Sequence, residues 1–153
     1  MVRSVACRWR TASGMEASNR KGSSMTISFN HTIVFARDKQ VSASFFTSLF
    51  ALPDAVAAGP FLAVLLDNGV TLDFADLSID VLPQHYAFLV TEEDFDGIYG
   101  RILERGMEHW ADPRKSRPGE INRNDGGRGV YFHDPAGHNL EIITRPYGSG
   151  SQS

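Results

Sequence analysis

The stretch YFHDPAGHNLEI, residues 131–142, holds two histidines, an aspartate and a glutamate, in a chain with five histidines in all. Its centre, DPAG at 134–137, favours a tight turn because proline fixes φ, glycine accepts positive φ and aspartate hydrogen-bonds the turn backbone. The flanking residues alternate in the manner of strands. We therefore expect a β-hairpin from residues 129–133 and 138–145, with Glu141 on its second strand.

The chain before this hairpin predicts two similar series of elements. Asp38 and Thr91 are typical helix N-caps, and the Asn-Gly pair after Asp67 marks a hairpin turn. The expected elements are a strand at 27–36, a helix at 38–52 and hairpin strands at 61–66 and 70–75, then a strand at 85–90, a helix at 91–106, a short strand at 107–111 and a polar loop at 112–128.

The two series register with each other, which indicates an internal duplication. A histidine lies in the first strand of each half, and seven residues separate His31 from Asp38 as they do His85 from Glu92. A carboxylate lies in the last strand of each half, at Asp73 and Glu141. The helices should bury apolar stripes toward the sheets, made of Val41, Phe45 and Leu49 in the first and of Phe95, Ile98, Tyr99, Ile102 and Leu103 in the second.

Strand side chains alternate between two faces, so the ionisable residues can be assigned to one of them. His31, His85 and Glu141 all lie opposite the larger apolar residues of their strands, and therefore on the face away from the helices. Two imidazoles and one carboxylate form a donor set suited to Fe²⁺, Mn²⁺, Zn²⁺ or Ni²⁺. A single strand histidine is usually a hydrogen-bonded core or surface residue. Three such residues at matching places favour a metal cleft, because an unpaired buried carboxylate is costly.

Composition excludes several classes of protein. The chain has 153 residues, a net charge of −3 and 42% hydrophobic residues, which suits one globular domain and gives no basic field for nucleic acid. No apolar run is long enough to span a membrane. Cys7 is the single cysteine, which excludes an internal disulfide and fits the cytoplasm. Residues 1–24 carry five basic residues and one acid without periodicity, so we expect a disordered or non-native extension before a domain at 25–148.

The motifs NHT at 30–32, HYAF at 85–88 followed by EEDF at 92–95, and the stretch at 131–141 resemble the vicinal oxygen chelate superfamily. This superfamily includes glyoxalase I, bleomycin-resistance proteins, extradiol dioxygenases and fosfomycin thiol transferases, and the motifs are most similar to the last. The resemblance implies an α+β fold of two βαβββ modules, here about 27–76 and 84–146, with curved mixed sheets around a metal cleft. It also implies a homodimer whose barrels combine modules of both chains.

The resemblance further implies roles for individual residues. His31, His85 and Glu141 match the metal ligands, with His31 of one subunit joining the other two from its partner. Asp73 is a possible fourth ligand or a hydrogen-bonding cleft residue. Tyr131 shares the face of Glu141 and could donate a proton to a small-molecule substrate. His133 and His138 are expected to be surface or turn residues.

The reaction stays open among thiol transfer, ring-cleaving dioxygenation and isomerisation. Fosfomycin thiol transferases carry a threonine where this chain has Ile33, and extradiol dioxygenases carry a histidine where it has Asn122, Arg123 and Asn124. In the basic loop 114–128, Arg123 and Arg128 are the candidates for binding an anionic substrate. The alternative is a metal-free, bleomycin-resistance-like protein that sequesters a drug.

Overall fold

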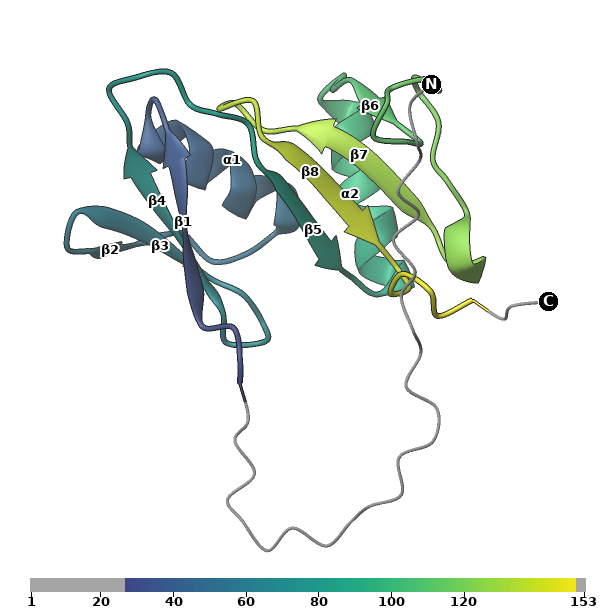
Figure 1. Cartoon of the computed structure of the whole chain (residues 1–153), viewed down its shortest axis with the longest axis horizontal. Coiled ribbons are helices and arrows are strands. Elements are labelled where there is room, and N and C mark those ends of the chain that lie inside the picture. The colour runs from purple at the N-terminus through teal and green to yellow at the C-terminus, as the bar shows by residue number, and fades with distance from the viewer. Residues whose placement is uncertain (1–26, 151–153) are drawn as a thin grey trace, which may run out of the picture.

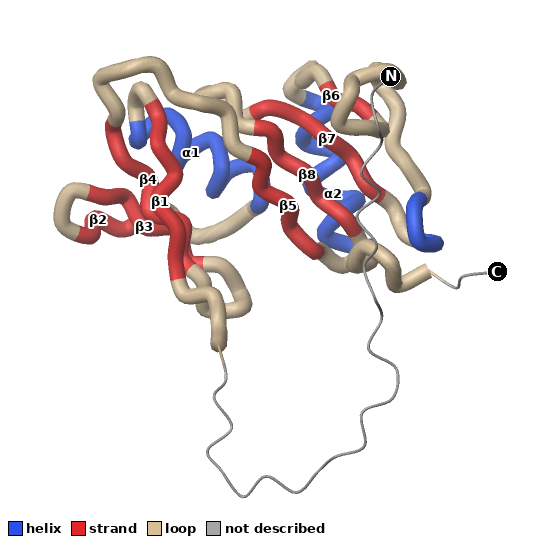
Figure 2. The backbone as a smooth tube through the Cα atoms, viewed as in Figure 1, coloured by secondary structure: helices blue, strands red, loops and turns tan. Residues whose placement is uncertain are grey.

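The computed structural model describes residues 27–150, which form two modules, each a four-stranded mixed sheet with one helix (Figures 1 and 2). The predicted extension and Cys7 lie outside the described residues. The first module comprises β1 (His31–Ala36), α1 (Lys39–Phe50), β2 (Val56–Ala58), β3 (Phe61–Leu65) and β4 (Thr71–Asp76). The second comprises β5 (His85–Leu89), α2 (Glu92–Glu104), β6 (His109–Trp110), β7 (Gly129–His133) and β8 (Asn139–Ile143), with a 3₁₀ turn at Asn124–Gly126.

The two sheets have equivalent topologies, which confirms the predicted α+β fold of paired βαβββ units. Their strand orders are β1-β4-β3-β2 and β5-β8-β7-β6. In each sheet the first strand pairs with the last in parallel, and the other pairs are antiparallel. Ile33 pairs with Asp73 in the first sheet, and Ala87 with Glu141 in the second. The two carboxylates that the sequence matched therefore lie on corresponding strands.

Both helices begin where their capping residues predict. The Asp38 carboxylate accepts hydrogen bonds from the backbone N–H groups of Gln40 at 2.9 Å and Val41 at 3.1 Å. The Thr91 hydroxyl accepts one from the backbone N–H of Asp94 at 3.1 Å. These bonds satisfy N–H groups that have no partner inside the helix.

Helices α1 and α2 lie on one side of the sheets and form a core that both modules share (Figure 1). The Phe46 ring of α1 lies 6.0 Å from that of Phe74 in β4 and 5.2 Å from that of Phe88 in β5, measured between centroids. The predicted helix stripes are wrong in part, because Val41 and Leu103 are each 52% exposed. Helix α1 instead turns Ser42, Ala43, Phe46, Thr47 and Leu49 inward.

His138 ties the two modules together. Its ring is 1% exposed, so the expectation of a surface position is wrong, although it does follow the hairpin turn. Nε2 donates a hydrogen bond to the backbone carbonyl of Phe35 in β1 at 2.8 Å, and Nδ1 accepts one from the backbone N–H of Gln84 at 3.0 Å. One imidazole thus joins the edge strand of the first sheet to the start of β5 and β8.

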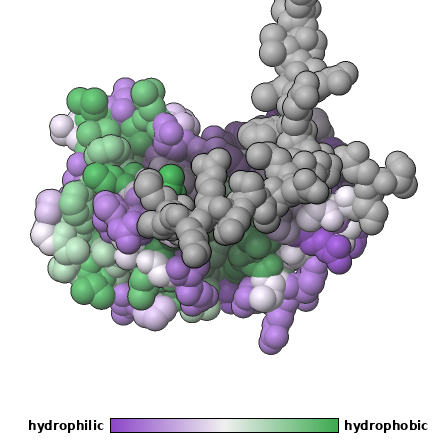
Figure 3. Space-filling model, turned by 60° about the horizontal axis from the view of Figure 1, so that its bottom comes forward, coloured by the Kyte–Doolittle hydropathy of each residue, from purple (hydrophilic) through white to green (hydrophobic). Residues whose placement is uncertain are grey.

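The sheet faces opposite the helices carry exposed apolar side chains. On the first sheet these include Ile33 at 39% exposure, Phe35 at 42% and Leu65 at 61%, and on β5 Leu89 at 60%. Figure 3 shows hydrophobic patches over the part of the surface that the first module forms. Within residues 27–150, no helix is both long and apolar enough to cross a membrane.

Candidate metal centre and cleft

The free face of the second sheet brings together three of the predicted site residues, His85, Tyr131 and Glu141. Strand pairing places Glu141 of β8 between Ala87 of β5 and Tyr131 of β7, and Trp110 of β6 next to Tyr131. Cross-strand partners share a face, so these side chains project to the same side of the sheet. His85 begins β5 on that face.

Glu141 and His85 form the centre of this face. The Glu141 side chain is 1% exposed and that of His85 is 47% exposed, and Nε2 of His85 lies 3.2 Å from Oε2 of Glu141. A buried carboxylate requires hydrogen-bonding or charged partners. The pair is therefore a fixed carboxylate below a histidine that reaches solvent.

A second contact of Glu141 comes from Tyr147, a residue that the sequence analysis did not single out. The Tyr147 hydroxyl donates to the carboxylate, with both oxygens 2.5 Å away. It also lies 2.9 Å from the hydroxyl of Tyr131. Since Tyr147 donates to the carboxylate, Tyr131 donates to Tyr147, and the proton chain ends on Glu141.

Both phenols are held in their protonated form. Burial raises the pKa of Tyr131 far above its ordinary value, and its hydrogen bonds with Glu141 and Tyr147 raise it further. Burial and the hydrogen bond to Glu141 likewise raise the pKa of Tyr147. Tyr131 is thus suited to donating a hydrogen bond and unsuited to acting as a base, and its role as a proton donor stays a prediction.

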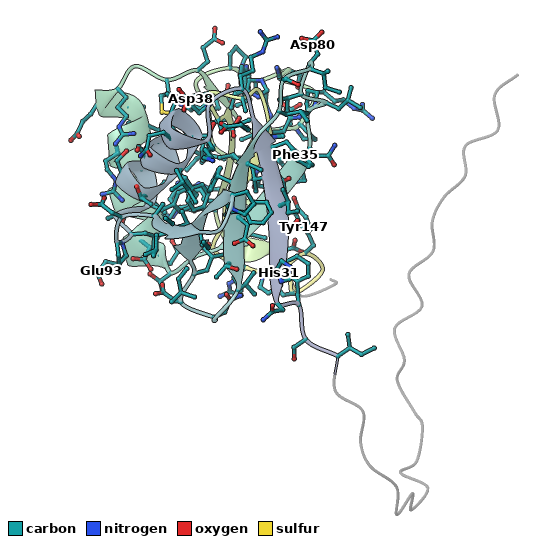
Figure 4. The ribbon with its side chains drawn as sticks, turned by 90° about the vertical axis from the view of Figure 1, so that its left-hand side faces the viewer. His31, Phe35, Asp38, Asp80, Glu93 and Tyr147 are labelled. Atoms are coloured by element: carbon teal, nitrogen blue, oxygen red, sulfur yellow. The ribbon has the colours of Figure 1, made fainter. Side chains whose placement is uncertain are left out.

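His31 does not join this pair within one chain. It is exposed at the start of β1, where Nδ1 lies 2.8 Å from the Asn30 side-chain oxygen. Within residues 27–150 of a single chain, no three His, Cys, Asp or Glu side chains come together in a metal-binding cluster. Figure 4 shows His31 on β1 of the first module and Tyr147 on the segment after β8.

Asp73 lies on the same face of the first sheet as His31. Its strand partners are Ile33 and Ala63, and its side chain is half-buried. Strand pairing also joins His31 to Thr71, two residues before Asp73, which fixes the shared face. The role of Asp73 as a fourth ligand or cleft residue stays a prediction.

The two arginines predicted to bind substrate lie elsewhere. Nε of Arg128 donates to Oε2 of Glu92 at 2.6 Å, and another guanidinium nitrogen donates to Oδ1 of Asp96 at 2.5 Å. Arg128 therefore attaches β7 to the start of α2, and its contact with substrate stays a prediction. Arg123 is exposed and lines neither cavity described below.

Two cavities meet at His85. The smaller, of 160 Å³, lies on the free face of the second sheet and is lined by His85, Trp110, Asp112, Pro113, Lys115, Tyr131, Phe132 and Asn139. The larger, of 580 Å³, lies between the modules, with β1 and the β3–β4 turn on one side and β5 and the start of α2 on the other. Its lining is mainly apolar.

The donor set formed by His85, which lines the smaller cavity, and the buried Glu141 beneath it fits a divalent cation. A carboxylate and a neutral imidazole are typical ligands of Fe²⁺, Mn²⁺, Zn²⁺ and Ni²⁺. The buried Glu141 is oriented by the Tyr147 phenol, as metal-binding carboxylates usually are by outer partners. Two protein ligands leave positions for a third ligand and a substrate.

Comparison with known proteins gives three informative similarities, although no family model matches the chain. The glutathione transferase FosA of Serratia marcescens is 32% identical over 125 residues, covering 77% of this chain and 81% of that protein. A solved structure named Oxidase ChaP-H2 is 59% identical with a TM-score of 0.81, covering 83% of this chain and 100% of that one. The fosfomycin resistance protein FosX from Mesorhizobium loti has a TM-score of 0.59 at 20% identity, covering 80% and 96%.

Proposed function

Because the chain belongs to the vicinal oxygen chelate superfamily, close to the fosfomycin-resistance proteins, we propose that it is a divalent-metal-dependent oxidase. Its substrate would be a small molecule that presents two adjacent oxygen atoms. The observation that carries the proposal is the buried Glu141 carboxylate 3.2 Å from the exposed His85 imidazole.

The choice of an oxidase rests on two supports. The similarity to Oxidase ChaP-H2, 59% over the whole of that chain, is much greater than the 32% identity to FosA. The residue types of the predicted ligand set, two histidines and one carboxylate, are those of non-haem iron oxygenases. Electrons taken from the organic substrate would pass to dioxygen.

The third ligand in this proposal is His31 of a second subunit. Within residues 27–150, one chain brings His85 and Glu141 together without a third ligand, and the first sheet presents His31 on a free face beside exposed Ile33 and Phe35. Apolar patches of this kind commonly mark an interface between chains. A homodimer would cover the patch and place His31 against the second sheet of the partner.

The chain's own residues then have distinct tasks. When bound, the cation supplies Lewis acidity toward a chelated oxygen pair and stabilises negative charge that develops there. Glu141, His85 and His31 hold it, and Tyr147 orients Glu141. Tyr131, whose raised pKa keeps its proton in place, would turn its hydrogen bond from the Tyr147 hydroxyl to a substrate oxygen.

Oxygen uptake by metal-loaded protein tests this function. The protein would be loaded in turn with Fe²⁺, Mn²⁺, Zn²⁺ and Ni²⁺ and assayed with a panel of catechols, α-hydroxyketones and α-keto acids. We expect the protein loaded with redox-active Fe²⁺ or Mn²⁺ to consume dioxygen with at least one compound of this panel. The matched variant His85→Ala should show no uptake, while His109→Ala, a histidine in the helix-side core, serves as a control for general damage.

Two results from companion assays, one with glutathione and fosfomycin and one of metal uptake and drug binding, would contradict the oxidase. Formation of a glutathione–fosfomycin adduct without oxygen uptake would assign the chain to thiol transfer, which its similarity to FosA makes the second candidate. Protein that takes up no cation under any metal supply, yet binds a drug in the cleft, would assign it to sequestration.

Removing the Tyr147 hydroxyl should weaken metal binding. This phenol donates to both oxygens of Glu141 and holds the carboxylate in place, as the outer partner of a metal ligand does. We expect Tyr147→Phe to lower metal affinity by about tenfold or more, the usual cost of losing such a partner. Competition titration with a chromophoric chelator measures this.

Tyr99→Phe is the matched control, because it removes a phenol that contacts His109 on the helix side of the second sheet. Its metal affinity should equal that of the unmodified protein. Equal or tighter binding by Tyr147→Phe would show instead that the phenol competes with the cation for the carboxylate.

A further inference from the structure

The loop after β6 presents one lysine to the cavity on the second sheet. Its backbone is fixed by Asp112, whose carboxylate accepts hydrogen bonds from the N–H groups of Arg114 at 2.9 Å and Arg117 at 3.1 Å and from the Ser116 hydroxyl at 2.8 Å. Lys115 lies at the tip of this turn with φ of 59°. Residues other than glycine rarely adopt positive φ, and such strain is concentrated at functional sites.

The Lys115 ammonium is held by two rings. Nζ lies 2.6 Å from Nε2 of His133 and 4.6 Å from the centre of the Trp110 ring. Nδ1 of His133 lies 3.3 Å from the backbone carbonyl of His138, which only a protonated Nδ1 can donate to. Nε2 is then the unprotonated nitrogen and accepts from the ammonium. The lysine is thus positioned by a neutral imidazole and an aromatic face.

The Lys115 ammonium has no counter-ion among the residues that the structure describes. No carboxylate within residues 27–150 forms an ion pair with it, because the oxygens of nearby Asp112 accept from the turn. An ammonium has three hydrogen-bond donors, and His133 takes one. The side chain is exposed and lines the same cavity as His85 and Tyr131. An anion in that cavity would complete its contacts.

The cavity also limits the shape of the anion. Its volume is 160 Å³, and a cavity of roughly 150 Å³ holds a single benzene ring. Ring side chains from three strands, namely His85, Trp110 and Tyr131, line it. His85 and Tyr131 are near parallel, with ring centres 6.0 Å apart. These surfaces suit a flat group of one ring.

We propose that Lys115 is a substrate-binding residue that takes the anionic oxygen of a small planar acid, whose ring occupies the cavity between Trp110 and the His85–Tyr131 pair. The assignment rests on the proposed function, in that this acid is part of the substrate presented to the metal centre. It gives the basic loop the anion-binding role expected from sequence, through Lys115 in place of Arg123 and Arg128.

Benzoate is a suitable probe, with neutral benzamide as its isosteric partner. Calorimetric titration of metal-free, chelator-treated protein excludes direct coordination of the carboxylate. We expect the unmodified protein to bind benzoate, and Lys115→Met to weaken that binding by about tenfold or more, since a charge-assisted hydrogen bond is lost. Benzamide binding should change little, and Lys115→Arg should retain most of the benzoate affinity.

Lys39→Met is the matched control, because this lysine contacts Asp76 and Pro60 far from the cavity. Equal benzoate affinity in Lys115→Met and the unmodified protein, or no benzoate binding by the unmodified protein, would overturn the assignment. Metal content measured on separate samples of the same proteins, dialysed against the divalent cations, separates the two proposals. Lys115-dependent benzoate binding by a protein that takes up no cation would contradict only the proposed function.

Discussion

Glu141→Gln is expected to abolish stoichiometric binding of a divalent cation. Glutamine keeps the size of the side chain and can still accept from Tyr147, but it removes the negative charge that the cation requires. Loss of an outer partner of a metal ligand alone costs 10–100-fold, so loss of the charged ligand should weaken binding on the order of a hundredfold or more. Elemental analysis after dialysis against the metal gives the content directly.

The control for this variant is Glu104→Gln, which makes the same change at an exposed position at the end of α2. It should bind as much metal as the unmodified protein. Because Glu141 is buried, the free energy of unfolding of the metal-free variants should be compared as well. Undiminished metal content in folded Glu141→Gln would remove Glu141 from the site.

The fold could be predicted from sequence because its signals are local. Asp38 and Thr91 cap their helices through hydrogen bonds to residues two or three positions away. Alternation along strands placed His85 and Glu141 on one face, and the structure brings them to 3.2 Å. Because side chains alternate along a strand with a period of two residues, each side chain can lie on only one of two faces. The large apolar residues show which of these faces is buried.

The buried side of α1 was predicted less well because its signal is mixed. Ser42 and Thr47 are buried although polar, while Val41 in the first turn is 52% exposed. Small residues allow the helix to approach β3 and β4 closely, and hydrophobicity alone does not reveal this. The face of α1 that packs against the sheet is therefore rotated from the face that the largest apolar residues predict.

Tyr147 and Lys115 could not be placed from sequence for a different reason. Tyr147 follows the end of β8, where strand alternation no longer predicts the direction of a side chain. Lys115 lies in a long loop whose shape depends on the bonds of Asp112. In the sequence, Arg128 is a basic residue near the site just as Lys115 is, yet in the structure it binds Glu92 and Asp96.

Assembly is the other feature that local sequence signals do not predict, and in the proposed function it would decide whether the metal centre is complete. His31 and Asp73 share a free face of the first sheet, while His85 and Glu141 share one of the second. Each chain thus offers two half-sites. A symmetric dimer in which the first sheet of each chain meets the second sheet of its partner would form two complete sites.

Mixed dimers of His31→Ala and Glu141→Gln chains, isolated through two different affinity tags, test this arrangement by their metal content. Each mixed dimer would contain one site with both changes and one intact site, so we expect about one cation per mixed dimer, although either variant alone binds none. Mixed dimers of His85→Ala and Glu141→Gln chains should bind none, because both changes fall in the same half-site. Absence of metal from the His31→Ala and Glu141→Gln pair, with unmodified protein fully loaded, would contradict a cation held by His31 of one chain and His85 and Glu141 of the other.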